Sequence, residues 1–173
     1  MPGFRAHRPA DVVTDWNAIA VQTILAGGRP AGGSLFLDIA TVHLAEHDAV
    51  AAIDGQFRPY HVVVPGASGS PVAAAAKAAY DILANRFPPQ TASLTIFYTN
   101  YLATHGLSQN DPGVGVGQQA AAGIIAFRAN DGSFPSRRPR PSPAETQSES
   151  GDPRRRRSPL PSLRSSVPNG LRR

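Results

Sequence analysis

The chain has 173 residues, a formal net charge of +5 and no cysteine, which excludes a disulfide framework and thiolate chemistry. No segment approaches the about 18–20 apolar residues of a membrane span, and the basic N-terminus lacks the apolar stretch of a signal peptide. The sequence therefore favours a soluble protein without a membrane span, cytoplasmic by default.

The charge is divided unevenly at Pro135. Residues 1–134 hold 7 Lys+Arg and 9 Asp+Glu, a net of −2, whereas residues 135–173 hold 10 Arg and 3 acids, a net of +7. The second segment has no aromatic residue and few apolar ones, so it buries too little apolar surface to offset its conformational entropy. The sequence predicts a helical module over 1–134 and a disordered Arg/Pro/Ser-rich tail over 135–173.

Two helices are predicted in the first third of the chain. Apolar residues at i, i+3/i+4 spacing predict a helix over about 11–26, ended by Gly27-Gly28. Its predicted buried face consists of Val12, Trp16, Ile19, Ala20, Thr23 and Ile24. A second helix is predicted over 34–54, with Ser34 as N-cap and Gly55 as its C-terminal stop. Because it is apolar on several faces, we expect it to be the central, most buried helix.

An extended connector is predicted over 56–69, with 62–64 as a candidate short strand. Ser70-Pro71 then begins a third helix, to about Arg86, because it places a hydroxyl cap before a proline at the first helical position. Its run of alanines allows close approach of neighbouring helices, so we expect packing on more than one side.

Two further predicted helices make the expected fold all-α. The fourth is predicted over about 90–104, with a buried side made of Leu94, Phe97, Tyr98, Tyr101 and Leu102. Asp111-Pro112 begins the fifth, to about Asn130, although Gly113, Gly115 and Gly117 weaken its first turns by about 1 kcal/mol each relative to alanine. The expected fold is a helical bundle fragment of about five helices followed by a disordered C-terminal tail.

His43, Glu46 and His47 match the H-x-x-E-H pattern of zinc peptidases. On a helix the two imidazoles share a face, so they can bind one Zn²⁺ with Glu46 as base. A third ligand would have to come from Asp81 or Asp111, or from Glu145 or Glu149 in the tail. The alternative, which we favour, is a polar layer that hydrogen-bonds to neighbouring helices. Its members are Asp38, Thr41, His43, Glu46, His47 and Asp48.

Other patterns are weaker. The glycines at 113, 115 and 117 lack the preceding strand and the lysine of a phosphate-binding loop, and no G-x-S-x-G elbow occurs. The arginines of the tail, clustered at 154–157, would bind nucleic acid only non-specifically, since no aromatic residue accompanies them to stack bases. We therefore expect no specific nucleic-acid partner.

Several segments, in order, resemble one family. They are residues 11–20 around Trp16, residues 42–55 from Val42 to Gly55, Arg58-Pro59-Tyr60, the alanines of 73–79, Arg86-Phe87-Pro88 and residues 126–132. As a set they resemble the N-terminal half of bacterial vanadium-dependent haloperoxidases, relatives of the type 2 phosphatidic acid phosphatases. The resemblance covers about residues 10–134 and implies a largely helical fold.

The resemblance also implies that an intact member binds vanadate. The family's anion site uses a lysine, six residues and Arg-Pro, then Ser-Gly-His, then an arginine and a second histidine, all in the C-terminal half. Here the only lysine is Lys77, the next arginine is Arg86, nine positions on and followed by Phe87, and no Ser-Gly-His occurs. No catalytic, cofactor-binding or metal-binding residue can be carried over, so we expect no cofactor in this chain.

The unusual composition of the tail can be explained through the same family resemblance. Codons for 156–167 can be chosen so that a shifted frame encodes a Pro/Ala/Phe-rich linker. Our hypothesis is that 135–173 is an out-of-frame translation and that the chain is the catalytically incomplete N-terminal portion of a haloperoxidase-like protein. A helical interaction module and a zinc hydrolase are the alternatives. The partner we expect is a second copy, held through an apolar face that is left exposed.

Overall fold

A computed structural model describes residues 9–28 and 33–131. Within these ranges the chain forms five α-helices, α1 (Pro9–Ala26), α2 (Gly33–Asp54), α3 (Pro71–Arg86), α4 (Thr91–Thr104) and α5 (Pro112–Arg128), with a short 3-10 helix, η1 (Pro88–Gln90), before α4. No strand occurs among them, so the all-α prediction is confirmed. The tail predicted over 135–173 lies outside the described residues.

The caps of α3 and α5 are joined at one point. The Ser70 hydroxyl accepts a hydrogen bond from the Ala73 amide at 3.3 Å, as its sequence predicts. Asp111 Oδ1 accepts from the Gly113 amide at 2.7 Å and from the Ser70 amide at 2.8 Å. One carboxylate therefore caps α5 and also fixes the start of α3 beside it.

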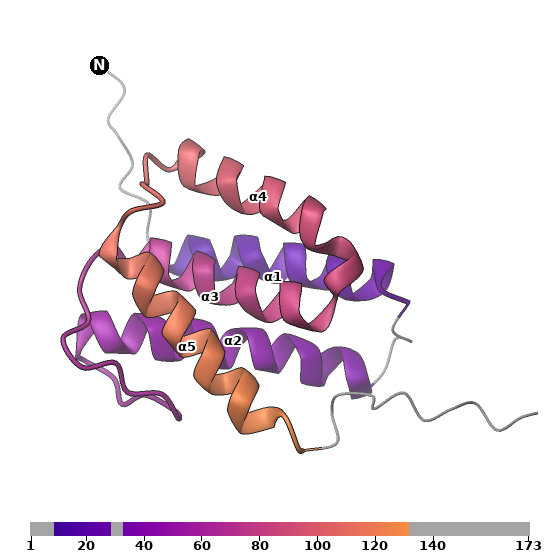
Figure 1. Ribbon diagram of the computed structural model, residues 1–173, viewed down its shortest axis with the longest axis horizontal. Helices are drawn as coiled ribbons and strands as arrows, with labels where there is room; N and C mark the ends of the chain where they lie inside the picture. Colours follow the sequence, from indigo (N-terminus) through magenta and orange to yellow (C-terminus); the bar gives the residue numbers. More distant parts are fainter. Residues whose placement is uncertain (1–8, 29–32, 132–173) are drawn as a thin grey trace, which may run out of the picture. The chain divides into compact units, whose positions relative to one another are not determined.

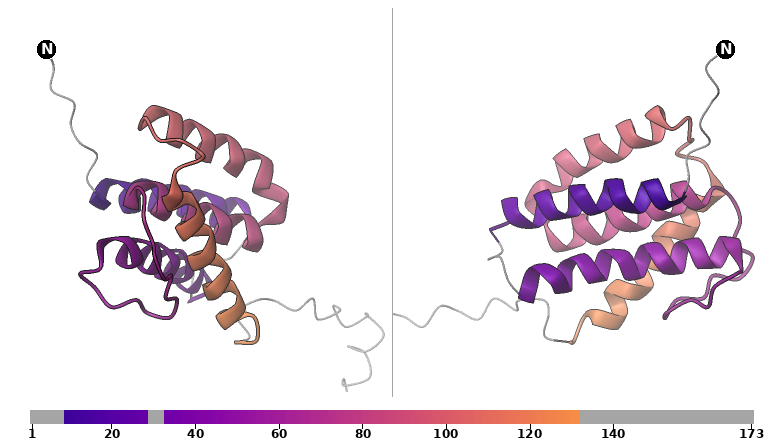
Figure 2. Two further views of the ribbon diagram at one scale, coloured as in Figure 1. Left: turned by 60° about the vertical axis from the view of Figure 1, so that its left-hand side comes forward. Right: turned by 180° about the vertical axis from the view of Figure 1, so that it is seen from behind.

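The alanine-rich helix α3 lies at the centre of the bundle. It packs against each of the other four α-helices, with α4 on one side, α2 on the opposite side and α5 crossing both α2 and α3 (Figures 1 and 2). Its packing on several sides confirms one expectation and corrects another, since α2 is not the central helix: Phe36 and Leu37 near its start are exposed. Alanine faces let four helices approach α3, whereas α2 packs mainly against α1, α3 and α5.

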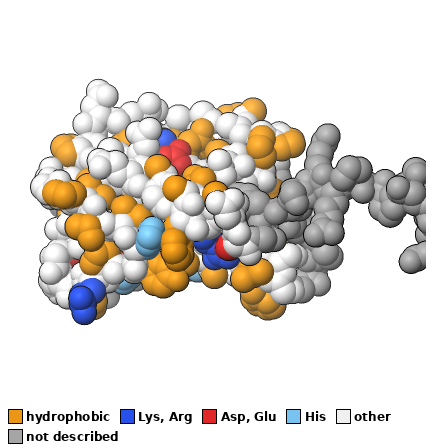
Figure 3. All heavy atoms as spheres, turned by 60° about the horizontal axis from the view of Figure 1, so that its bottom comes forward, with side chains coloured by type: hydrophobic (Ala, Val, Ile, Leu, Met, Phe, Trp, Pro, Cys, Tyr) orange, Lys and Arg blue, Asp and Glu red, His pale blue; other side chains and the backbone are white. Residues whose placement is uncertain are grey.

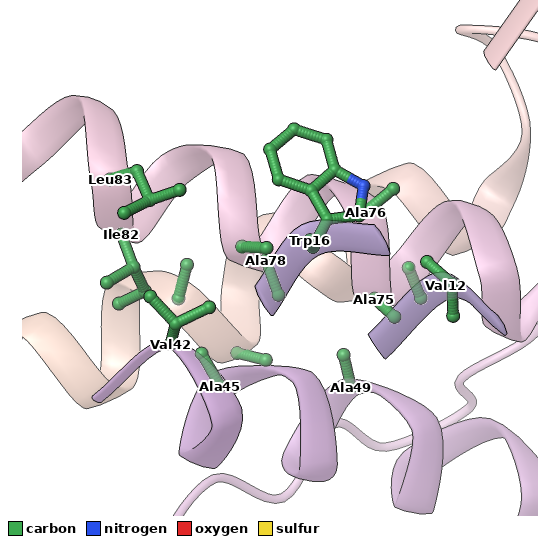
Figure 4. Packing of buried hydrophobic residues seen from close by; sticks show 14 of the residues in the cluster. Val12, Trp16, Val42, Ala45, Ala49, Ala75, Ala76, Ala78, Ile82 and Leu83 are labelled. Atoms are coloured by element: carbon green, nitrogen blue, oxygen red, sulfur yellow. The ribbon is translucent and has the colours of Figure 1, made fainter. Parts of the chain in front are cut away.

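Small residues make the central contacts. Ala45 and Ala49 of α2 face Ala75 and Ala78 of α3, and Trp16 of α1 lies along α3 (Figure 4). On the other flank of α3, Gly117 of α5 lies so close that an added Cβ would overlap the Ala74 carbonyl oxygen. The glycine that weakened the sequence prediction for α5 is thus where α5 contacts α3.

Three finer predictions are wrong. Helix α2 begins at Gly33, so Ser34 is inside the helix and is not its N-cap. Residues 62–64 form no strand. Phe97 is half exposed, because the stripe of α4 that faces the core runs through Leu94, Tyr98, Tyr101 and Leu102 and leaves Phe97 at its edge.

Candidate functional site

The polar residues of α2 form a buried layer. Asp38, Thr41, Glu46 and Asp48 are all buried. Asp38 forms an ion pair with Arg86 of α3, and both side chains are 1% exposed. Thr41 donates to the Leu37 carbonyl oxygen of its own helix at 2.7 Å. The layer matches the predicted alternative to a zinc site, although part of it bonds to a loop and to α2 itself as well as to neighbouring helices.

His43 and His47 have different partners. His43 Nδ1 lies 2.7 Å from Glu46 Oε2, and its Nε2 lies 3.1 Å from Asn17 Oδ1 of α1. His47 Nε2 lies 3.1 Å from the Arg58 carbonyl oxygen. Both ring nitrogens of His43 are therefore engaged within the protein.

A zinc site is not assembled by these residues. Among the described residues, no group of three or more His, Cys, Asp or Glu side chains is placed to hold a metal ion. Asp81 pairs with Lys77 at 2.7 Å, and Asp111 is used in the helix caps. Glu145 and Glu149 lie outside the described residues. The arrangement gives no support to the zinc alternative.

The described cations do not gather into an anion site. Lys77 pairs with Asp81, Arg86 with Asp38, and Arg128 with Asp131 at 2.8 Å. Tight binding of vanadate or phosphate needs several cations aimed at one point. The residues described here do not fit that group.

Asp48 holds the loop 55–69 against α2. This carboxylate is fully buried and accepts hydrogen bonds from three successive amides, those of Tyr60, His61 and Val62, at 2.5, 3.0 and 2.8 Å. Hydrogen bonds to an ionised acceptor are about twice as strong as neutral ones. The loop backbone is therefore fixed in one conformation.

The same loop is also fastened to α5. Val62 lies against Gly123 so closely that an added Cβ there would overlap the valine side chain. The His61 ring stacks on Phe127 with centroids 4.1 Å apart, and Tyr60 meets Phe127 edge-on at 6.2 Å. The loop is thus held from two helices.

These anchors leave large apolar side chains in solvent. Phe57, Tyr60 and Val63 of the loop and Phe127 of α5 are exposed, and we call these four residues the exposed platform. Figure 3 shows hydrophobic side chains gathered on this face around an imidazole, beside a pair of opposite charges. Next to them is an open hollow of about 530 Å³, whose lining is Leu44, Tyr60, Phe127, Arg128, Asn130 and Asp131.

Sequence reasoning missed the exposed platform. The alternation of prolines, glycines and apolar residues over 56–69 was interpreted as a connector. The signal that could have revealed it is a loop with an aromatic residue at 57 and 60 and valines at 62–64, beside an aspartate on the preceding helix. The glycines at 113 and 117, by contrast, allow α5 to pack closely against α3, as their contacts with Ser70, Ala74 and Lys77 indicate.

None of the helices in the described part is both long and apolar enough to cross a bilayer. No protein-family model, curated protein or solved structure matches the chain. The resemblance to vanadium haloperoxidases therefore stays a prediction from its ordered motifs.

Proposed function

We propose that the described helices are the N-terminal, scaffolding portion of a vanadium haloperoxidase-like protein and that this chain is catalytically incomplete. The proposal rests on the ordered motifs between residues 11 and 132. One structural observation supports it most: a loop fastened to two helices exposes large apolar side chains to solvent, at the exposed platform.

The anchoring of the loop is what makes this observation informative. Single exposed apolar residues are normal on soluble proteins, whereas a group of them that is held in place is typical of a binding surface. Asp48 and Gly123 immobilise the loop before any partner arrives, so little conformational entropy remains to be lost on binding. A further folded unit, supplying the cations that these helices lack, would cover the platform.

The position of the last described residues fits this role. Asn130 and Asp131 line the same hollow as Tyr60 and Phe127, so the chain leaves the described helices at the platform. A unit that follows residue 131 in an intact relative would be tethered beside the surface it covers, which raises its effective concentration there.

An activity assay tests the catalytic part of the proposal. The purified full chain is incubated with vanadate, peroxide and bromide, and separately with a phosphomonoester. We expect no turnover above that of the reagents alone, because Lys77, Arg86 and Arg128 are paired with carboxylates at separate places and Arg58 is the one other Lys or Arg side chain among the described residues. Turnover that saturates with vanadate, or phosphatase activity that copurifies with the chain, would contradict the proposal.

The neighbouring DNA tests the family assignment. We expect a shifted frame after the codons for about residue 135 to encode the lysine, Arg-Pro, Ser-Gly-His and arginine–histidine motifs. A downstream sequence without them in any frame would favour a helical interaction module instead.

Size-exclusion chromatography then distinguishes the interaction module from the scaffold, because an interaction module forms a defined dimer and a scaffold without its partner forms monomers or aggregates.

A further inference from the structure

Asn17, His43 and Glu46 link the middle of α1 to α2 through a continuous line of polar atoms. Asn17 Oδ1 lies 3.1 Å from His43 Nε2, and His43 Nδ1 lies 2.7 Å from Glu46 Oε2. We propose that these three residues form a proton-dependent latch, which holds α1 on α2 while the His43–Glu46 pair carries a proton and loosens when that proton is lost.

The hydrogen-bond pattern requires the proton. Because Asn17 Oδ1 only accepts, His43 Nε2 must carry a hydrogen to bond with it. Nδ1 then meets Glu46 Oε2 productively only if a second hydrogen lies between them, either on the ring or on the carboxyl group. A neutral ring facing an ionised Glu46 would set a lone pair against a carboxylate oxygen.

The burial of Glu46 makes loss of that proton unfavourable. Glu46 is 1% exposed, and its Oε1 is buried with no hydrogen-bond partner among the described residues. An ionised carboxylate in this position would keep only one partner, and buried charges are costly unless they are well paired. The His43 side chain is 36% exposed, so protons can exchange with solvent through its ring.

The other charged groups around α2 are committed elsewhere. On α3, Arg86 pairs with Asp38 and Lys77 with Asp81; on α5, Arg128 pairs with Asp131. On α1, Asp15 accepts from Tyr101 of α4 at 3.3 Å. In the loop and on α2 itself, Asp48 accepts three amides, His47 faces the Arg58 carbonyl oxygen, His61 stacks on Phe127, and Arg58 and Asp54 are exposed. None of these contacts involves Glu46.

The direction of the pH effect follows from both partners. Burial raises the pKa of Glu46 to about 6, against the opposing hydrogen bond from His43. The hydrogen bond to Glu46 raises the pKa of His43 above its ordinary value of 6.5. A group whose pKa is raised by folding stabilises the fold below its unfolded pKa and loses that contribution as pH rises through its folded pKa. The contribution of Glu46 is therefore complete below about pH 4.5 and is lost as pH rises through 6. The pair keeps a shared proton on His43 until the pH passes the raised pKa of His43, above 6.5, and there the latch opens.

The chain contains its own reporter of this event. Trp16 is the only tryptophan and immediately precedes Asn17 on α1. Its side chain is fully buried, with the rings of Tyr98 and Tyr101 at 6.4 and 6.0 Å. Loosening of α1 would expose this indole, so its fluorescence emission would shift to longer wavelength.

The test is a pH series on the full chain. Tryptophan emission and Tm are measured from pH 4.5 to 8.5 for wild type, for Glu46→Gln and for His47→Gln. We expect the wild-type Tm to fall by about 4 °C or more across this range, with a red shift in emission. Glu46→Gln keeps a donor toward His43 Nδ1 and cannot ionise, so most of the pH dependence should disappear. His47→Gln, one residue along the same helix, is the matched control and should keep the wild-type profile.

Two results would overturn the latch. One is a wild-type profile that is flat over this range, which is what a turned-over Asn17 amide donating to a neutral ring would give. The other is a Glu46→Gln variant whose Tm and emission keep the full wild-type pH dependence. If Glu46→Gln does not fold, the imidazole signals of wild type are followed by NMR and His43 is assigned by their loss in His43→Gln. A His43 midpoint above 6.5 supports the latch, and one at or below 6.5 contradicts it.

Discussion

In the core around α3, apolar side chains of every size from alanine to tryptophan are buried, whereas at the exposed platform a buried carboxylate holds a loop whose large apolar side chains are in water. Ala74 and Ala78 of α3 are fully buried. At the platform, the fully buried Asp48 fixes a loop from which Phe57 and Val63 point into solvent. Burial of the core side chains explains why they are apolar. The platform side chains are apolar but exposed, so stability within the described residues does not explain them.

The difference separates two roles for the same kinds of residue. Glycine at 117 brings two helices together in the core, and glycine at 123 brings the loop onto α5 at the platform. In the core the close approach buries apolar surface on both sides. At the platform it positions Tyr60 beside Phe127 at the surface. We therefore expect core substitutions to change the global free energy of unfolding, and platform substitutions to change local order or surface properties.

The largest expected effect is at Gly117, in the core. Gly117→Ala places a Cβ on the Ala74 carbonyl oxygen and near Lys77 Cβ, at 2.9 Å, and backbone cannot move aside cheaply. We expect the free energy of unfolding to fall by about 3 kcal/mol, the upper end of the usual cost of overpacking, as measured by chemical denaturation. The matched control is Gly115→Ala, two residues earlier on α5 with open space around it. There alanine should stabilise the helix by about 0.5–1 kcal/mol, and equal effects at the two positions would contradict the close packing of α3 and α5.

The next effect is at Asp48, which anchors the platform. Asp48→Asn replaces a carboxylate that accepts from three amides by a group with one acceptor and a donor that opposes them. We expect a loss of about 1–3 kcal/mol, the usual penalty for unsatisfied buried groups. Hydrogen exchange should accelerate at the amides of residues 60–62 more than in α3. Asp54→Asn, exposed at the end of the same helix, is the control and should change neither. Uniform acceleration across α3 would show that the loop and the core unfold together.

Much of the fold could be predicted from the sequence because its signals are local. Ser70-Pro71 and Asp111-Pro112 mark helix starts through hydrogen bonds within three residues, and both begin α-helices where predicted. Gly55, with φ of +65°, ends α2 as expected. The choice of central helix was wrong because apolar content measures only how much surface a helix can bury. How many neighbours can approach depends on side-chain size, and alanine at 73–76 decided it.

The candidate site was less predictable because its contacts are long-range. Asp48 was correctly placed in a polar layer, but nothing in the spacing indicates that its partners are the amides of a loop 12–14 residues later. The H-x-x-E-H pattern grouped His43 with His47, whereas in the structure His43 contacts Glu46 and Asn17, and His47 contacts the Arg58 carbonyl oxygen. Asn17 lies 26 residues before His43, on α1, and no local pattern points to it.

The smallest expected effect on stability is at Val63, and its neighbour Val64 shows why it is informative. Val63 is 72% exposed and Val64 is 8% exposed, although they are adjacent in the same loop. Val63→Ser should change the free energy of unfolding by no more than about 0.5 kcal/mol, as is usual for surface positions. Val64→Ser, which removes buried methyl groups and buries a hydroxyl, should cost about 2 kcal/mol.

Binding of a hydrophobic fluorescent dye to the folded chain distinguishes the two exposed apolar surfaces, the platform and the outer face of α4. It should decrease in Val63→Ser if the platform is the main apolar binding surface, whereas unchanged dye binding would move that role to the exposed Ile96 and Phe97 of α4.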